Sequence, residues 1–168
     1  MSTRFADTTP ELAELIAGAD HVDVKRVRAR TSLRGFLAAF ISYHPRWLDW
    51  LYVVRAGLVR LLGMRQEHMD TAPLEEQDVD LTPGGKLRFF TTELSREDRL
   101  WVGIAEDKHL AARVVVERRS GDHGTAVFLV FTVVHYKHWT GPVYFNLIRP
   151  FHHLVVLGMC RSVERAFP

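Results

Sequence analysis

The sequence predicts an α+β fold in which a curved antiparallel sheet is closed by helices. Three observations lead to this prediction. Four strand-like segments between residues 86 and 137 are joined by short polar connections, which are typical of antiparallel neighbours. A helical pair precedes them, and a long apolar segment with helical periodicity follows them. The 168 residues suffice for one domain with a sizeable core.

The N-terminal part alternates between helix and strand. Thr9-Pro10-Glu11 indicates the start of a short helix, because threonine can cap a helix and proline suits its first turn. Val22 and Val24 then alternate with charged residues, which predicts a strand over residues 21–30 with one solvated face. Two further helices are predicted, Leu33–Ser42 and Pro45 to about Leu62, the second ended by Gly63.

A polar connection and a meander follow the helical pair. Residues 65–85 are predicted to form a loop, with a short strand near Val79–Leu81 and a type II turn at Thr82-Pro83-Gly84-Gly85. The four strand segments come next: Lys86–Leu94, Arg99–Glu106, His109–Arg118 and Thr125–Lys137. The fourth is apolar on both faces over Ala126–Val134, as expected for a strand that is covered on both sides.

The C-terminal segment, Thr140 to Phe167, is predicted to be one long helix, because its apolar residues recur at helical spacing. Pro150 lies inside it and cannot donate the backbone hydrogen bond of an interior helical residue. We therefore expect the helix to be kinked or broken near Leu147–Arg149.

Composition and charge exclude several classes of protein. The net charge is +2 with acidic residues interspersed, so no basic tail or stripe points to nucleic acid. Cys160 is the single cysteine, which excludes an intrachain disulfide and a multi-cysteine zinc site and suits a reducing cytoplasm. The sequence has no signal-peptide core and no uncharged stretch of about 18 residues that could span a bilayer. We expect a soluble, cytoplasmic protein.

The densest polar group consists of Glu106, Asp107, His109 and Arg113, at a predicted strand–turn–strand corner. At the mouth of a cavity, Asp107 and His109 could act as an acid–base pair or orient a ligand through hydrogen bonds. A charged turn in solvent, with His109 paired to a carboxylate, is the simpler interpretation. Only the geometry of the folded chain separates the two.

Four histidines suggest a metal site but lack the spacing for one. His135 and His138 lie three positions apart on a strand and point to opposite faces. His152 and His153 are adjacent on a helix and diverge by about 100°. Zinc requires three or four converging ligands, so we expect no metal and no other cofactor. Cys160 is expected to be a buried, inert thiol.

Aromatic residues gather on the predicted helix that begins at Pro45. Core packing, a lid over a cavity and contact with a membrane surface are all consistent with Trp47, Trp50 and Tyr52, and nearby arginines support the last. On the C-terminal helix, Arg149 and Tyr144 could meet the polar end of a ligand.

Two motifs carry a family resemblance. The first runs from Glu106-Asp107-Lys108-His109-Leu110 to Arg113-Val114, and the second, Tyr136 to Arg161, contains Trp139-Thr140-Gly141 and Ile148-Arg149-Pro150-Phe151-His152. They resemble the motifs of a bacterial domain-of-unknown-function family, although the family's usual aspartate after His-Leu is Ala111 here. Its members resemble the START-like or Bet v 1-like superfamily of helix-grip and polyketide cyclase-like proteins. The resemblance implies a curved sheet that grips one long helix around a cavity, but it implies no reaction.

The predicted function is binding of a small, largely apolar or aromatic ligand between the sheet and the C-terminal helix. The polar groups near the ligand would be Asp107, His109, His135 and Arg149. The apolar walls are expected to be Val102, Ile104, Leu110, Val114, Phe128, Val130, Tyr144, Ile148 and Phe151. A one-residue error in the facing of the fourth strand would exchange Phe128 and Val130 for Leu129 and Phe131.

Two other functional classes are compatible with the sequence. A cyclase- or dehydratase-type enzyme would use Asp107, His109 or His135 for proton transfer, which requires one of them inside the cavity with a shifted pKa. A protein- or membrane-interaction module would fill the cavity with its own side chains and bind through the exposed aromatic helix. The sequence predicts no particular oligomeric state.

Overall fold

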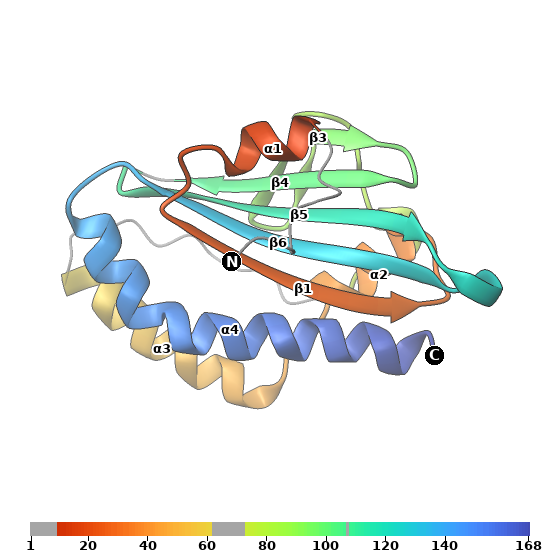
Figure 1. Ribbon diagram of the computed structural model, residues 1–168. Coiled ribbons are helices and arrows are strands. Elements are labelled where there is room, and N and C mark those ends of the chain that lie inside the picture. The colour runs from red at the N-terminus through yellow and green to blue at the C-terminus, as the bar shows by residue number, and fades with distance from the viewer. Residues whose placement is uncertain (1–9, 62–72, 107) are drawn as a thin grey trace.

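The computed structural model describes residues 10–61, 73–106 and 108–168 (Figure 1). Its elements follow the predicted order, with a first strand, a helical pair, a meander and a long C-terminal helix. The structure is α+β: a six-stranded antiparallel sheet packs against the C-terminal helix, in an arrangement similar to a helix grip. The predicted fold class is confirmed.

The sheet pairs the first strand in the sequence with the last. Its strands are β1 His21–Ala29, β2 Lys86–Leu87, β3 Phe90–Arg96, β4 Leu100–Glu106, β5 Leu110–Ser120 and β6 Ala126–Tyr136. Their spatial order is β1-β6-β5-β4-β3-β2, so β1 forms one edge beside β6, and the short β2 lies at the other edge. The central strands β5 and β6 pair from Leu110↔Tyr136 to Ser120↔Ala126.

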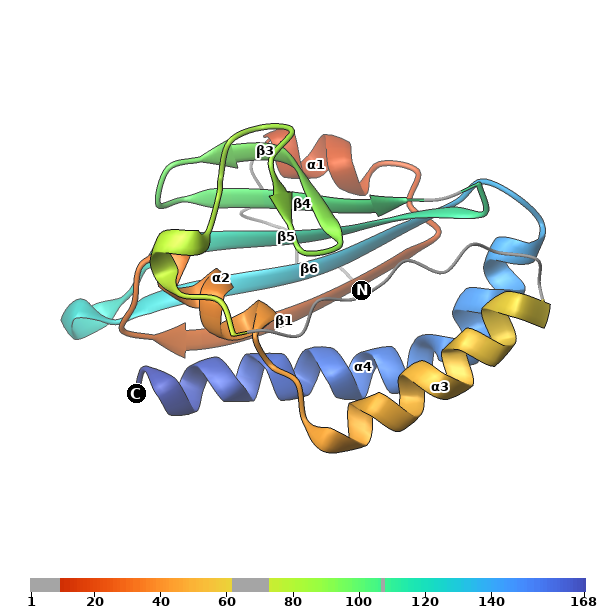
Figure 2. The same cartoon turned by 180° about the vertical axis from the view of Figure 1, so that it is seen from behind.

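Helices cover both faces of the sheet (Figures 1 and 2). They are α1 Pro10–Ile16, α2 Leu33–Ile41, α3 Arg46–Leu61 and α4 Thr140–Ala166. The helices α2 and α4 pack on one face, α3 lies along α4, and the short α1 lies on the opposite face. None of the described helices is both long and apolar enough to cross a membrane.

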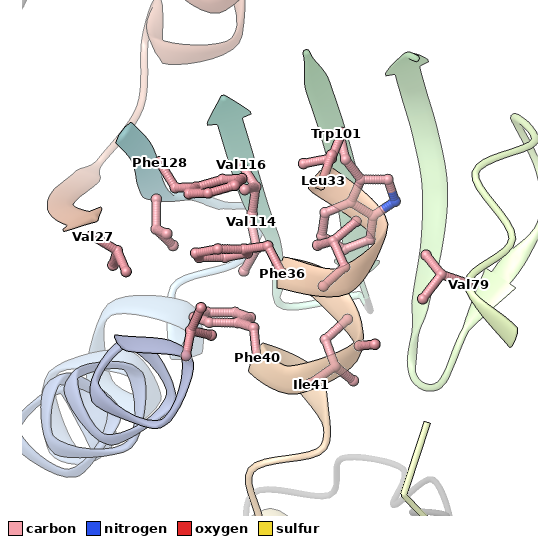
Figure 3. Close-up of a cluster of buried hydrophobic side chains, with 14 of the residues drawn as sticks. Val27, Leu33, Phe36, Phe40, Ile41, Val79, Trp101, Val114, Val116 and Phe128 are labelled. Carbon is pink, nitrogen blue, oxygen red and sulfur yellow. The ribbon is translucent and has the colours of Figure 1, made fainter. Parts of the chain in front are cut away.

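The larger core lies between the sheet, α2 and α4 (Figure 3). Phe36 of α2 is fully buried and stacks on Phe128 of β6 with 4.2 Å between ring centroids. Phe40 stacks on Phe36 at 5.5 Å, one helical turn further along. The helix begins after Ser32, whose side chain accepts a hydrogen bond from the Gly35 N–H. The apolar residues Leu33, Phe36, Leu37 and Phe40 recur at helical spacing, and all four are buried, so the sequence pattern matches the buried face of α2.

A second core lies on the opposite face, beneath α1. Leu12 of α1 is fully buried among residues that include Val115 of β5 and Phe131 of β6. Because β6 contributes alternate residues to both cores, it is apolar on both faces, as its sequence predicts. Phe128 and Val130 belong to the core beneath α2 and α4, which confirms the facing predicted for this strand.

Two predicted strands differ from the structure. The segment Lys86–Leu94 forms a hairpin of β2 and β3 instead of one strand, because Arg88, with a φ of 56°, turns the chain between them. The segment Val79–Leu81 is not a strand; a 3-10 helix, η1 (Glu76–Asp78), precedes it. Val79 and Leu81 alternate with polar residues because both side chains are buried in the larger core.

The long helix α4 continues through Pro150 without a break. The proline lacks the N–H that would bond to the carbonyl of Asn146. Figures 1 and 2 show that the first turns of α4 are inclined to the rest of the helix. The inner residues Phe145 and Val156, on either side of the proline, are both buried, so packing holds the helix together where its sequence predicts a kink or break.

Candidate functional site

The sheet face toward α4 is organised in cross-strand rows. One row pairs Ala105 with Ala112, Ala112 with Val134, and Val134 with His21, so it crosses the sheet from β4 to β1. Neighbouring strands lie about 4.8 Å apart, which makes this row about 14 Å wide. The row begins with the small apolar side chains of Ala105 and Ala112 and ends with the polar side chain of His21. The surroundings of its two ends therefore differ in polarity.

At the β4–β5 end of the row, two clusters of buried residues meet. Ala105 packs against the larger core, and its register partner Ala112 packs against a smaller cluster. This smaller cluster consists of Leu110, Val134, Tyr144 and Phe145. Ala105, Ala112 and the nearby Ile148 of α4 are only partly buried. We call Ala105 and Ala112 the alanine pair; it is a partly exposed position on a face that is otherwise packed.

Gly103 has no side chain and leaves room on β4 for the ring of Trp101. The ring of Trp101 folds over it, so that a Cβ at position 103 would lie 2.2 Å from the indole. The Trp101 Nε1–H donates to Thr92 Oγ1 at 3.1 Å, which holds the indole in place. The side chains next to the alanine pair are therefore fixed by packing and a buried hydrogen bond.

The other end of the row holds a polar cluster between β1 and α4. We define it as His21, Asp23 and Lys25 of β1 together with His152 and His153 of α4. Lys25 donates a hydrogen bond to Asp23, and His153 Nδ1 lies 3.4 Å from Asp23 Oδ2. The rings of His21 and His153 meet edge to face at 5.8 Å. Within the described chain, the buried Nε2 atoms of His21 and His152 have no hydrogen-bond partner.

Burial controls the protonation of the polar cluster. Burial, followed by the charge of His153, lowers the pKa of His152 to about 4. Burial also lowers the pKa of His21. For Asp23 burial acts in the opposite direction, but the hydrogen bond and charge of Lys25 outweigh it and lower its pKa. At neutral pH the cluster therefore combines a Lys25–Asp23 ion pair with neutral rings of His21 and His152.

His109 links the β4–β5 corner to the start of α4. Its Nδ1 lies 2.5 Å from Thr140 Oγ1, which also lies 3.0 Å from His138 Nδ1. The His109 carbonyl accepts backbone hydrogen bonds from Lys137 and His138, at 2.8 and 3.2 Å. Gly141 permits this approach, because a Cβ there would lie 2.7 Å from the same carbonyl oxygen. The candidate acid–base residue His109 is thus part of the connection that starts the helix.

Five of the predicted ligand-binding residues lie between the sheet and the helices. Val114 and Phe128 belong to the larger core. Leu110 and Tyr144 belong to the smaller cluster, and Ile148 packs against it. Four of these side chains are buried, and Ile148, which packs against the same cluster as Ala112, is only partly buried.

Three predicted wall residues face elsewhere. Ile104 pairs with Arg113 on the sheet face opposite α4, because Trp101 and Gly103 take the α4 side of β4; Val102 shares the face of Ile104. Phe151 is exposed on the outer side of α4. The expectation that these residues line the space between the sheet and α4 is therefore wrong.

The predicted polar residues do not gather at one place. His135 lies on the face opposite α4, where its Nε2 is 3.4 Å from the Ala17 carbonyl oxygen, so its predicted position near the ligand is also wrong. Arg149 is exposed to solvent. Asp107 lies outside the described residues.

The polar cluster was not predicted from the sequence. The alternation of His21, Asp23 and Lys25 could have indicated three polar groups on one face of β1. Their proximity to His152 and His153 depends on where α4 packs. No group of three or more His, Cys, Asp or Glu side chains in the described ranges could hold a metal ion.

Cys160 lies on the inner side of α4 and is buried, as predicted. Burial raises its pKa to about 12, so the thiolate, which is the reactive form, is suppressed at neutral pH. The thiol is therefore a packing group of the larger core.

A surface depression of about 510 Å³ lies away from α4, beside α2 and η1. It is lined by Arg34, Glu75, Glu76 and Gln77. Arg34 donates to the Val79 carbonyl, and Ser32 donates to Glu76. These contacts fasten η1 to α2, which accounts for the charged lining without a ligand.

Comparison with known proteins gives one match. A family model described as "Protein of unknown function (DUF2867)" matches residues 15–159, which include the whole sheet, the alanine pair and the polar cluster. No curated protein and no solved structure matches the chain.

Proposed function

The chain belongs to the DUF2867 family, whose description gives no function, and we propose a function from the geometry of the structure. The proposed function is binding of a small, largely apolar or aromatic ligand at the alanine pair. The observation that carries this proposal is the partial exposure of Ala105 and Ala112. Their neighbours on the same face, Val114 and Val134, are buried. A partly uncovered position on an otherwise packed sheet face, here beside the β4–β5 corner, is a natural place for a ligand to complete the packing.

The residues around the alanine pair favour an apolar ligand. Leu110 and Val114 flank Ala112 on its face of β5, and Ile148 approaches from α4. The nearest charged side chain of β5, Arg113, points to the opposite face and donates to Glu93 at 2.6 Å. Small-molecule sites are mostly apolar, with a few polar groups that fix orientation.

The fold resemblance supports the same function. In helix-grip proteins the space between the sheet and the long helix holds the ligand, and we propose that this chain shares the START-like superfamily relationship its motifs imply. This support concerns the fold and not the chemistry of a site. A buried, protonated Cys160 is consistent with the proposed cytoplasmic location.

The enzymatic alternative has less support. His135 faces away from α4, and His109 is held by Thr140 at the start of that helix. His135 therefore lies outside the space between the sheet and α4, and the contact of His109 with Thr140 already serves the start of the helix. We therefore favour binding without assigned turnover.

Native mass spectrometry of the protein purified from its host tests the proposal. We expect a stoichiometric apolar compound to be released on gentle denaturation, and its chemistry would identify the ligand class. An empty protein with no thermal shift across a panel of lipids and aromatic metabolites would contradict ligand binding.

A further inference from the structure

The outer face of α4 has no role in the proposed ligand site. We define this face as Val143, Leu147, Phe151, Leu154 and Leu157, which recur every three or four residues and are between 36% and 57% exposed. The opposite side of the same helix buries Phe145, Val156 and Val163. A surface helix normally carries polar residues on its outer side, so a row of exposed apolar residues there indicates a further contact.

The charge around the outer face is positive. The sequence contains no aspartate or glutamate between Asp122 and Glu164. On the described part of the neighbouring α3, the one acidic residue is Asp49, which lies 3.3 Å from His44 Nε2. The exposed basic residues of this layer are Arg149, Arg161 and Arg165 on α4, and Arg46 and Arg60 on α3. Lys137, just before α4, forms an ion pair with Glu106, and the exposed Glu164 lies near the C-terminal end of the helix.

Exposed tryptophans accompany these arginines. Trp139 directly precedes α4 and is 73% exposed, and Trp47 and Trp50 are exposed at the start of α3. Tryptophan favours the boundary between water and acyl chains, where its apolar ring and its N–H group are both accommodated. An apolar helical face with arginine and tryptophan at its margins is typical of helices that lie in a membrane interface.

We propose that the outer face of α4 binds the surface of a bilayer that contains anionic lipid, with the helix parallel to the membrane plane. The distance from Val143 to Leu157 is about 21 Å along the helix, so all five side chains can contact the interface together. A second copy of the chain fits less well, because a symmetric contact through this face would bring the same arginines together. An anionic headgroup layer neutralises them instead.

Vesicle flotation tests the proposal, with phosphatidylcholine vesicles prepared with and without phosphatidylglycerol. We expect binding to require phosphatidylglycerol and to weaken as the salt concentration rises. Leu154→Glu should lower partitioning at least about tenfold, because it removes a leucine that the interface would bury. Arg161→Gln leaves the apolar face intact and should reduce the salt dependence of binding.

Phe89→Glu is the matched control. It also replaces an exposed large apolar residue with a carboxylate, but it lies in the β2–β3 turn, at the sheet edge remote from β1. It should leave vesicle binding unchanged, and thermal unfolding checks that all three variants keep the fold.

Several results would overturn the proposal. The protein could fail to float with either kind of vesicle, or it could bind vesicles that lack phosphatidylglycerol equally well. Leu154→Glu and Phe89→Glu could also reduce vesicle binding to the same extent. The protein could also fail to bind vesicles and form a dimer in sedimentation velocity that Leu154→Glu dissociates. In that case the outer face is a contact between two copies of the chain, and the membrane proposal is wrong.

Discussion

His109 Nδ1 and Thr140 Oγ1 lie 2.5 Å apart although 31 positions separate them in the sequence. This buried contact joins the corner between β4 and β5 to the first residue of α4. It explains why a histidine occupies a position that the sequence alone presents as a candidate for acid–base chemistry. In the folded chain, His109 connects the β4–β5 corner to the first residue of α4.

Thr140→Val should lower the free energy of unfolding by about 1–3 kcal/mol, because it removes the hydroxyl that serves the buried His109 imidazole. Thr140→Ser keeps this hydroxyl and should retain most of the stability. Urea unfolding of both variants measures the difference. Equal losses in the two variants would assign the effect to packing of the threonine methyl group.

The stability of the protein should decline as the pH falls from about 6.5 towards 4, because the unfolded chain protonates His152 in this range while the folded chain keeps it neutral. The contribution is fully present above the unfolded pKa and is lost below it. A lowering from 6.5 to about 4 corresponds to about 3 kcal/mol.

His152→Leu isolates this contribution. It removes the titrating group but leaves the carboxylates, so its unfolding free energy should fall less steeply with pH than that of the wild type. Urea unfolding at a series of pH values gives both curves. Parallel curves would mean that His152 titrates normally in the folded protein.

Ala112→Leu should occupy the space beside the alanine pair and reduce ligand binding. We expect the affinity for an anilinonaphthalenesulfonate probe to fall about tenfold, since the added side chain competes for the same apolar surface. Ala13→Leu, on an exposed position of α1, makes the same change elsewhere and is the control. A loss of stability above about 3 kcal/mol in Ala112→Leu would instead show a closed, fully packed position.

Truncation of two phenylalanines should destabilise the protein to very different extents. Phe36→Ala should cost about 3–5 kcal/mol, because the fully buried ring stacks on Phe128. Phe151→Ala should cost less than about 1 kcal/mol, because this side chain is exposed on α4. Urea unfolding compares them directly. A large loss for Phe151→Ala would show that the isolated chain already buries the outer face of α4.

Local periodicity accounts for most of the elements. The buried face of α2, the alternation of β5 and the double-sided β6 all follow from the spacing of apolar residues along a short stretch of chain. The hairpin at Arg88 was not predicted, because the positive φ of an arginine cannot be recognised from the pattern of apolar residues. Val79 and Leu81 gave the alternating pattern of a strand because a loop can also bury alternate residues.

The candidate site depended much more on tertiary structure. By itself the sequence determined the order of the main elements, the family and the alternation of the two faces along β5 and β6. Only the tertiary structure decided that Ile104 and His135 face away from α4, that α4 leaves Phe151 outside, and that the histidines of α4 meet β1. Alternation divides a strand into two faces, but which face a distant helix covers depends on long-range packing, which no local pattern encodes.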